Sequence, residues 1–130
     1  MREILFRGKY DGDWVEGNLF IPDKPDTPTQ ICIGTNIIRI TYDVIPETVG
    51  QYTGLTDKNG KKIFEGDIIK SCEYDDIYFV KYCADDNYPA FDIVPEMNIE
   101  CNGLSHLHIV EGIEVIGNIH DNPELLKGGA

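Results

Sequence analysis

Apolar and polar residues alternate with a period of two through most of the chain, which indicates β-strands. Residues 2–10 alternate between apolar and charged side chains and lead into Asp11-Gly12, one of the dipeptides preferred in tight hairpin turns. Residues 14–21 alternate again. The pattern therefore predicts a β-hairpin at the start of the chain.

A second hairpin is predicted from two runs rich in β-branched residues, 31–33 and 37–42, joined by Gly34-Thr35-Asn36. Residues 22–28 hold three prolines and two aspartates and are expected to form a surface loop. Pro46 is expected to interrupt strand pairing, because proline cannot donate a backbone hydrogen bond.

Asn59-Gly60 is a strong turn signal, since both residues tolerate a positive φ at low cost. The sequence further predicts a bend at 65–67 and a short helix that begins at Asn122-Pro123-Glu124. Between these points it predicts four strands and two loops, the second loop with one helical turn. The strands are 67–71, 77–82, 90–94 and 114–119, and the loops are 83–88 and 95–107.

These short strands, with no helix of ordinary length, predict an all-β fold. We expect a single, mainly antiparallel, barrel- or sandwich-like domain over residues 1–130, with a short C-terminal helical turn. The length of 130 residues suits one domain, and no linker or internal repeat divides it.

The net charge of −12 is concentrated in the second half of the chain. Residues 1–70 hold nine basic and eleven acidic side chains, whereas residues 71–130 hold two basic and twelve acidic ones. A phosphate backbone is repelled by such a surface, so we expect no direct binding of nucleic acid. The interpretation we favour is a solubilising surface, and a surface for a basic partner or a mimic of DNA remain alternatives.

Candidate chemical residues are few. The four cysteines (Cys32, Cys72, Cys83 and Cys101) form no C-x-x-C pair, and we expect reduced, mostly buried thiols. A zinc site with His106 and His108, which would share one face at strand spacing, is a weaker alternative. His120 and Asp121 could form the kind of pair in which a carboxylate orients a general base, but a surface position is the simpler interpretation. We therefore expect no catalytic residue, no metal and no cofactor.

No stretch reaches the roughly 18 consecutive apolar residues that cross a bilayer, and residues 1–10 lack the apolar core of a signal peptide. We expect a cytoplasmic protein that makes no contact with a membrane.

Residues 46–70 read PETVGQYTGLTDKNGKKIFEGDIIK, and this stretch closely resembles the signature of the YopX family. The opening ILFRGK (4–9) with WVEGNL (14–19), and the closing EVIGNIHDNPELL (114–126), resemble the two ends of the same family. The resemblance implies a mainly β fold and a protein encoded by a phage or prophage of a Gram-positive bacterium. It implies no activity, because the biochemical role of such proteins is not established.

The residues of the motif also have a structural explanation. Its glycines fit turns, Asp57 and Asp67 fit turn-capping hydrogen bonds, and its apolar residues (Tyr52, Ile63, Phe64 and Ile68) fit a core. The alternative is a site for a ligand or partner at Gln51, Tyr52 and Thr53, whose polar groups need hydrogen-bond partners if they line a groove.

Our leading hypothesis is a non-enzymatic protein-interaction module that acts on a host or phage protein, with homo-oligomerisation as an open option. The alternative of a small-molecule or nucleotide-handling enzyme requires a pocket with converging carboxylates. The third hypothesis, an acidic DNA mimic, requires carboxylates spaced like phosphates along one surface.

Overall fold

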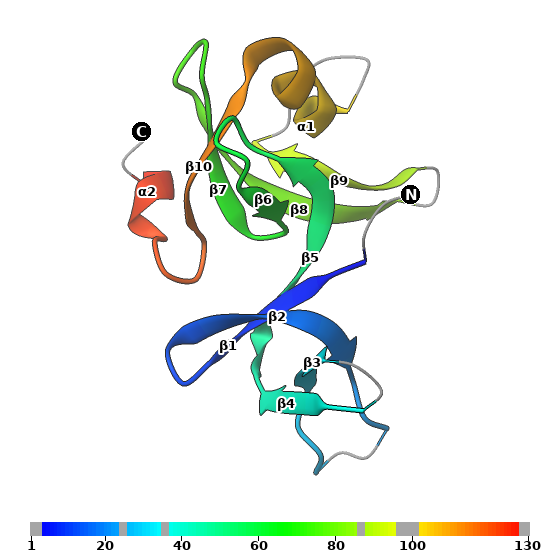
Figure 1. Cartoon of the computed structure of the whole chain (residues 1–130). Helices are drawn as coiled ribbons and strands as arrows, with labels where there is room; N and C mark the ends of the chain where they lie inside the picture. The colour runs from blue at the N-terminus through cyan, green and yellow to red at the C-terminus, as the bar shows by residue number, and fades with distance from the viewer. Residues whose placement is uncertain (1–3, 24–25, 35–36, 86–87, 96–101, 128–130) are drawn as a thin grey trace. The chain divides into compact units, whose positions relative to one another are not determined.

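A computed structural model describes residues 4–23, 26–34, 37–85, 88–95 and 102–127. Strands hold more than half of these residues. The chain forms two compact units, unit 1 with residues 1–52 and unit 2 with residues 53–130 (Figure 1). Each unit is described by itself below.

Unit 1 consists of antiparallel strands. They are β1 (Phe6–Tyr10), β2 (Asp13–Phe20), β3 (Gln30–Gly34), β4 (Arg39–Asp43) and the first part of β5 (Ile45–Thr56). Their order in the sheet is β4-β3-β2-β1-β5, so β4 is an edge strand.

Both predicted hairpins of unit 1 are confirmed. β1 and β2 pair through a turn in which Asp11 has a φ of 49° and Gly12 a φ of 87°. Positive φ at both central residues is the type I′ geometry that suits the twist of a hairpin. β3 pairs with β4 in the second hairpin, with Ile31 opposite Tyr42 and Ile33 opposite Ile40.

Pro46 lies inside β5, but the pairing of β5 with β1 is interrupted there, as predicted. The register between β1 and β5 shifts beside it, so that Lys9 pairs with Ile45 while Arg7 pairs with Gly50. Proline is tolerated at such a bulge, where the ladder lacks a hydrogen bond in any case. Thr48 fills the gap, since its hydroxyl accepts from Lys9 N–H at 2.9 Å and donates to the Ile45 carbonyl at 2.6 Å.

Unit 2 contains the rest of β5 and eight further elements. These are β6 (Lys62–Phe64), β7 (Asp67–Ser71), β8 (Ile77–Asp85), β9 (Tyr88–Val94), α1 (Gly103–His106), the π-helical turn η1 (Leu107–Glu111), β10 (Ile113–Asn118) and α2 (Glu124–Lys127). A four-stranded antiparallel sheet has the order β10-β7-β8-β9. Separately, β5 is hydrogen-bonded to β6.

The core of unit 2 is a single cluster of apolar side chains from the sheet, β6 and the α1–η1 segment. Its buried members are Ile63, Ile69, Tyr78, Val80, Phe91, Ile93, Leu104, Leu107 and Ile113. The predicted burial of Tyr52, Ile63, Phe64 and Ile68 is also confirmed, with at most 7% of each residue exposed.

The predicted loop at 83–88 was mostly wrong. β8 runs on to Asp85 and β9 begins at Tyr88, with Cys83 paired to Ala90. The polar residues there belong to a long hairpin, where strand pairing outweighs their weak β propensity. The segment 95–107 contains the expected helical turn as α1, while 96–101 lie outside the described residues.

The mainly antiparallel β fold with a short C-terminal helical turn is confirmed, and the described strands form no closed barrel. That residues 1–130 behave as one domain stays a prediction.

Candidate functional site

The predicted site residues lie consecutively in β5. Gln51 pairs with Phe6 and is half-buried, whereas Tyr52 and Thr53 are buried. The Thr53 hydroxyl donates to the carbonyl of Ile63 at 2.8 Å, so one of its polar groups serves the fold. A binding role for Gln51, Tyr52 and Thr53 stays a prediction.

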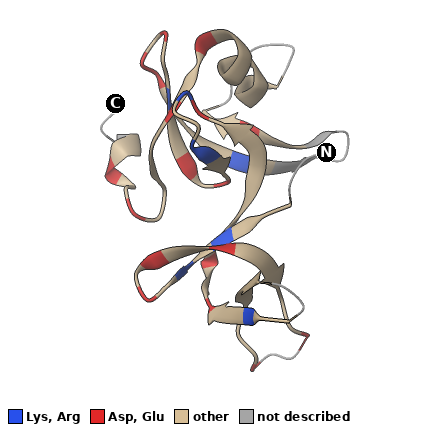
Figure 2. Ribbon diagram, in the orientation of Figure 1, with Lys and Arg blue, Asp and Glu red and all other residues tan. Residues whose placement is uncertain are grey.

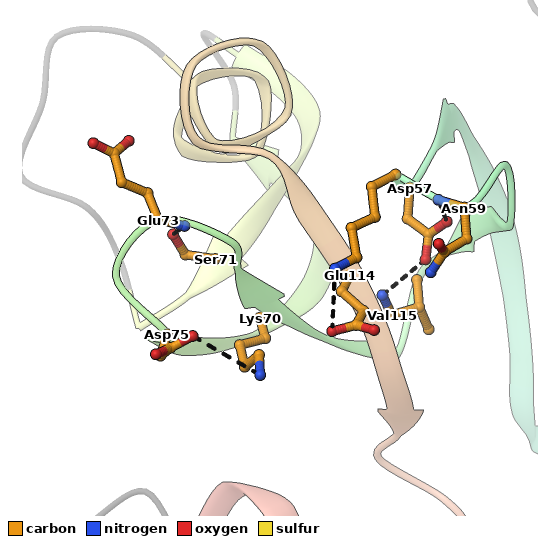
Figure 3. A network of polar contacts seen from close by, with 9 residues as sticks. Asp57, Asn59, Lys70, Ser71, Glu73, Asp75, Glu114 and Val115 are labelled. Atoms are coloured by element: carbon orange, nitrogen blue, oxygen red, sulfur yellow. Dashed lines mark hydrogen bonds and ion pairs between the residues drawn. The ribbon is translucent and has the colours of Figure 1, made fainter.

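Asp57 holds the turn that follows β5, as expected for a turn-capping aspartate. Its carboxylate accepts backbone N–H groups from Asn59 at 2.8 Å and Val115 at 3.0 Å (Figure 3), and from Lys61 at 2.9 Å. Burial raises the pKa of the Asp57 carboxyl, but these three hydrogen bonds and the nearby charge of Lys61 outweigh it. The pKa therefore lies below its ordinary value of 3.8.

The Asn59-Gly60 turn differs from the two-residue form that the sequence suggests. Gly60 N–H donates to the Asp57 carbonyl at 3.0 Å, and of the two predicted turn residues only Gly60 has a positive φ, of 80°. The Asp57 carboxylate takes part in this turn and holds Asn59 in place, so Asn59 does not need the left-handed conformation.

The same turn covers one edge of the unit 2 sheet. β10 is the end strand of that sheet, and its Val115 N–H donates to Asp57 Oδ2. Beside it, the Ile113 carbonyl accepts from Lys58 N–H at 2.9 Å. Outward backbone groups of β10 are therefore occupied by residues of the motif.

The opposite edge strand, β9, is covered by side chains. The Phe91 carbonyl accepts from Asn102 Nδ2 at 2.8 Å, and Ile93 N–H lies 2.8 Å from its acceptor, Asp92 Oδ1. Asp92 Oδ1 also accepts from Leu104 N–H, at 3.3 Å, at the start of α1. Both edges of this sheet thus have capping groups that hinder pairing with another chain.

β4 in unit 1 presents a different edge. No strand lies beyond it among the residues that the structure describes. Val44 N–H donates to the carbonyl of Thr29 at 3.0 Å, and in an antiparallel ladder alternate residues face the same neighbour. The backbone groups of Arg39, Thr41 and Asp43 therefore point away from β3.

The β3–β4 hairpin also exposes apolar side chains. Ile37 is 93% exposed, Ile38 71% and Ile40 53%, and Ile33 lies opposite Ile40 across the two strands. We call Ile33, Ile37, Ile38 and Ile40 the hairpin isoleucines. Single exposed apolar residues are ordinary, but four within eight positions of one hairpin are not.

The sequence analysis did not identify this surface. The hairpin isoleucines were assigned to the predicted strands 31–33 and 37–42, with no statement of which side chains are exposed. A signal was present in the density of isoleucine around Gly34-Thr35-Asn36.

A hollow of about 260 Å³ lies beside this hairpin on unit 1. Its lining includes Phe20, Cys32 and the one cationic side chain, Arg39, and it contains no carboxylate among the described residues. The enzyme hypothesis required converging carboxylates, and this hollow does not supply them.

Three hydrogen-bonded side chains in unit 2, a serine, a glutamate and a histidine, are of the types found in catalytic sites. Ser71 donates its hydroxyl to Glu111 Oε1 at 2.6 Å, and Glu111 Oε2 lies 3.1 Å from His106 Nε2. The same hydroxyl accepts from the N–H group of Glu73 at 3.3 Å (Figure 3) and from that of Tyr74 at 3.2 Å. Its donor and both lone pairs are used, so Ser71 fastens the 71–75 turn to η1 and is not poised as a nucleophile.

The prediction that His106 and His108 share a face was wrong. They belong to α1 and η1, and residues two apart on helical backbone point in different directions. His120 is exposed, in agreement with the surface interpretation.

Cys72 is exposed and Cys32 half-buried, so the expected burial of the thiols was wrong for these two, while the side chains of Cys83 and Cys101 lie outside the description. Within the described ranges, no three His, Cys, Asp or Glu side chains gather closely enough to hold a metal ion. The described helices are also too short and too polar for any of them to span a membrane.

Basic and acidic residues occur in both units (Figure 2), but the acidic excess is larger in unit 2. Residues 1–52 hold five basic and eight acidic side chains, and residues 53–130 hold six and fifteen. Two ion pairs of unit 2, Lys58–Glu114 and Lys70–Asp75, each have a separation of 3.9 Å and are partly exposed, so each contributes little to stability.

Comparison with family profiles identifies one family. The sequence profile described as YopX protein matches residues 5–127. Among solved structures, protein EF1440 from Enterococcus faecalis is similar, with a TM-score of 0.59 and 25% sequence identity, over 97% of this chain and 99% of that chain. No curated protein matches the sequence. The similarity to EF1440 therefore includes residues of both units.

Proposed function

The chain belongs to the YopX family, and we propose that it is a protein-interaction module with no chemistry of its own, which binds a partner protein through the β3–β4 hairpin. The exposure of the hairpin isoleucines carries this proposal.

Burial of these side chains is the available source of binding energy. Covering one exposed isoleucine is worth about 1.5–3 kcal/mol. Several together can offset the cost of association, which is roughly 4–15 kcal/mol. Arg39 and Asp43 lie at the two ends of β4 and supply polar groups around the apolar centre, the common composition of protein interfaces.

The setting of this activity is part of the proposal. We propose an accessory protein encoded by a phage or prophage that acts in the cytoplasm of the bacterial host. Its partner is a host or phage protein, and the acidity of residues 53–130 favours a partner with a basic surface. No direct contact with nucleic acid is proposed.

Site-specific photo-crosslinking tests the proposal. A photoreactive phenylalanine analogue replaces Ile38 in one variant and Glu73, an exposed polar residue of unit 2, in the matched control. Both are used at about 1 µM in host lysate, where a weak self-association is not populated. We expect the Ile38 variant alone to form an adduct with another protein, and mass spectrometry of the adduct identifies it.

A companion variant, Ile37→Ser with Ile38→Ser, removes apolar surface without touching the buried core. We expect it to compete poorly with the adduct when added in excess, whereas unlabelled wild-type protein competes well. Absence of an adduct at position 38, or equal adducts at 38 and 73, would show that the hairpin is not the binding surface.

A further inference from the structure

We propose that β4 is also the interface between two copies of this chain, which pair their β4 strands antiparallel about a twofold axis at Thr41. This inference rests on the proposed function in using the same exposed hairpin, and it names a second copy as an occupant of the strand edge. The result joins two sheets through their edges.

The backbone of β4 permits this pairing. Arg39, Thr41 and Asp43 direct their N–H and C=O groups away from β3. With Thr41 opposite Thr41 of the second copy, these outward groups meet in hydrogen-bonded pairs. Each copy then gains a continued ladder without disturbing its pairing to β3.

The side chains of β4 are complementary to themselves. The strand reads Arg39-Ile40-Thr41-Tyr42-Asp43. Antiparallel pairing about Thr41 places Arg39 of each copy opposite Asp43 of the other, which makes two ion pairs of opposite charge. The Asp43 carboxylate already accepts from Gln30 Nε2 at 2.9 Å through Oδ1, and a carboxylate has further acceptor positions for a guanidinium.

The apolar residues match in the same arrangement. Ile40, 53% exposed, lies opposite Tyr42 of the second copy, an aromatic and β-branched cross-strand pair of a favourable kind. Tyr42 is held in place by the ring of Tyr10, with centroids 4.9 Å apart in an edge-to-face arrangement. Ile40 of the second copy therefore packs on a Tyr42 ring that is already held in place.

Charge also selects the register. A shift of two residues in either direction places Arg39 or Asp43 opposite uncharged residues. A shift of four places Arg39 opposite Arg39, or Asp43 opposite Asp43, which is repulsive. Only the register about Thr41 makes both ion pairs, so the sequence specifies one dimer.

The strand edges of unit 2 do not offer the same opportunity. Outward groups of β10 bind the Asp57 turn, and those of β9 bind Asn102 and Asp92. Edge strands are normally protected against pairing with another chain. The β4 edge, with its exposed isoleucine and self-complementary charges, is therefore the better candidate for a dimer interface.

Charge reversal tests the inference. Sedimentation velocity is measured from about 1 µM to about 500 µM for wild type, Arg39→Asp, Asp43→Arg and the double swap. We expect wild type to dimerise with rising concentration. By symmetry each single reversal makes both ion pairs repulsive, so we expect the dimer Kd to rise about tenfold or more, and the double swap to restore it.

Mixing gives a sharper readout. Arg39→Asp carries two acids on β4 and Asp43→Arg two bases, so we expect an equimolar mixture of the two to form a heterodimer although neither dimerises well alone. As a second kind of variant, Thr41→Pro removes an outward N–H and no bond to β3. It should keep the β-type circular dichroism spectrum and lose the dimer.

A wild-type chain that stays monomeric over the whole range would overturn the inference. So would a dimer that is indifferent to the single reversals, or single reversals that neither the double swap nor the mixture rescues. These outcomes are separate from the crosslinking result, because an adduct with another protein at position 38 can form whether or not the chain dimerises.

Discussion

Units 1 and 2 treat their large apolar residues in opposite ways. Among the described residues, unit 2 holds eleven of the fourteen buried apolar side chains, while unit 1 holds nine of the thirteen large exposed ones. Of the apolar side chains described in unit 1, only Ile31, Val44 and Tyr52 are buried. The comparison teaches that apolar residues stabilise the fold in one unit and remain available for contacts in the other.

The strand edges differ in the same direction. In unit 2, the residues of the family motif and the start of α1 occupy outward backbone groups of β10 and β9. In unit 1, β4 ends its sheet with exposed side chains on the strand. The edge strands of the unit 2 sheet are therefore protected by other residues, whereas the β4 edge of unit 1 is exposed.

The largest effect on stability is expected in the core of unit 2. Ile69 is fully buried within the apolar cluster, so Ile69→Ala should lower the free energy of unfolding by about 3 kcal/mol, through lost transfer energy and a cavity. Val110→Ala, at a position 62% exposed in the same unit, is the control and should change it by less than about 0.5 kcal/mol. Urea titrations give both values, and similar losses would contradict the assignment of the core.

The second effect concerns the Asp57 turn. Asp57→Asn removes the charge that receives three backbone N–H groups, and we expect a loss of about 2 kcal/mol at neutral pH. Asp76→Asn, at an exposed position of the same unit, serves as a control with the same change of charge. Equal unfolding midpoints for the two variants would mean that Asp57 is replaceable.

The pH dependence of this difference has a defined sign. The pKa of Asp57 in the folded chain lies below the ordinary 3.8, so its contribution to stability is fully present above that value. It is lost as the pH falls through the folded-state pKa, where the carboxyl is protonated. The gap between wild type and Asp57→Asn should therefore narrow below pH 3.8 in acid titrations followed by circular dichroism, and a gap that widens there would contradict the linkage.

The third effect compares one turn from each unit. Gly60 and Gly12 have φ values of 80° and 87°, and a side chain at either would meet no atom within 4 Å. Valine at either position should therefore cost about 1 kcal/mol or more from backbone strain alone. Thermal melts measure the loss, with Gly60→Asn as the milder control because asparagine tolerates this region.

The pair of glycine variants also tests the domain prediction. If residues 1–130 unfold as one domain, Gly12→Val and Gly60→Val should each lower a single melting transition. Two transitions, each sensitive to the variant in its own unit, would show that the units unfold separately.

Local chemistry made much of the fold predictable. The Asp11-Gly12 turn and the strand 67–71 follow from dipeptide preferences and alternation, and both are confirmed. The interruption of pairing at Pro46 is confirmed as well, but the register shift that accommodates it depends on β1, far away in the sequence, and could not be predicted. The loop at 83–88 was misjudged because pairing with β9 overrides local polarity.

The candidate surface was less predictable than the fold. Period-two alternation assigns Ile33 and Ile40 to a face of a strand, but it contains no information on what covers that face. Coverage depends on the rest of the unit, and unit 1 provides few buried partners. The edge position of β4 likewise follows from sheet order, which sequence patterns do not give.

The smallest effect is expected at the hairpin, and it is the sharpest test of the contrast between the units. Ile38 is 71% exposed, so Ile38→Ser should change the free energy of unfolding by less than about 0.5 kcal/mol. The matched control is Ile31→Ala in β3, which is fully buried and should cost about 2 kcal/mol or more. Urea titration at low protein concentration, where no dimer contributes, separates the two. A loss for Ile38→Ser as large as that for Ile31→Ala would mean that Ile38 packs inside unit 1. The hairpin would then belong to the core, and the surface on which both binding proposals rest would not exist.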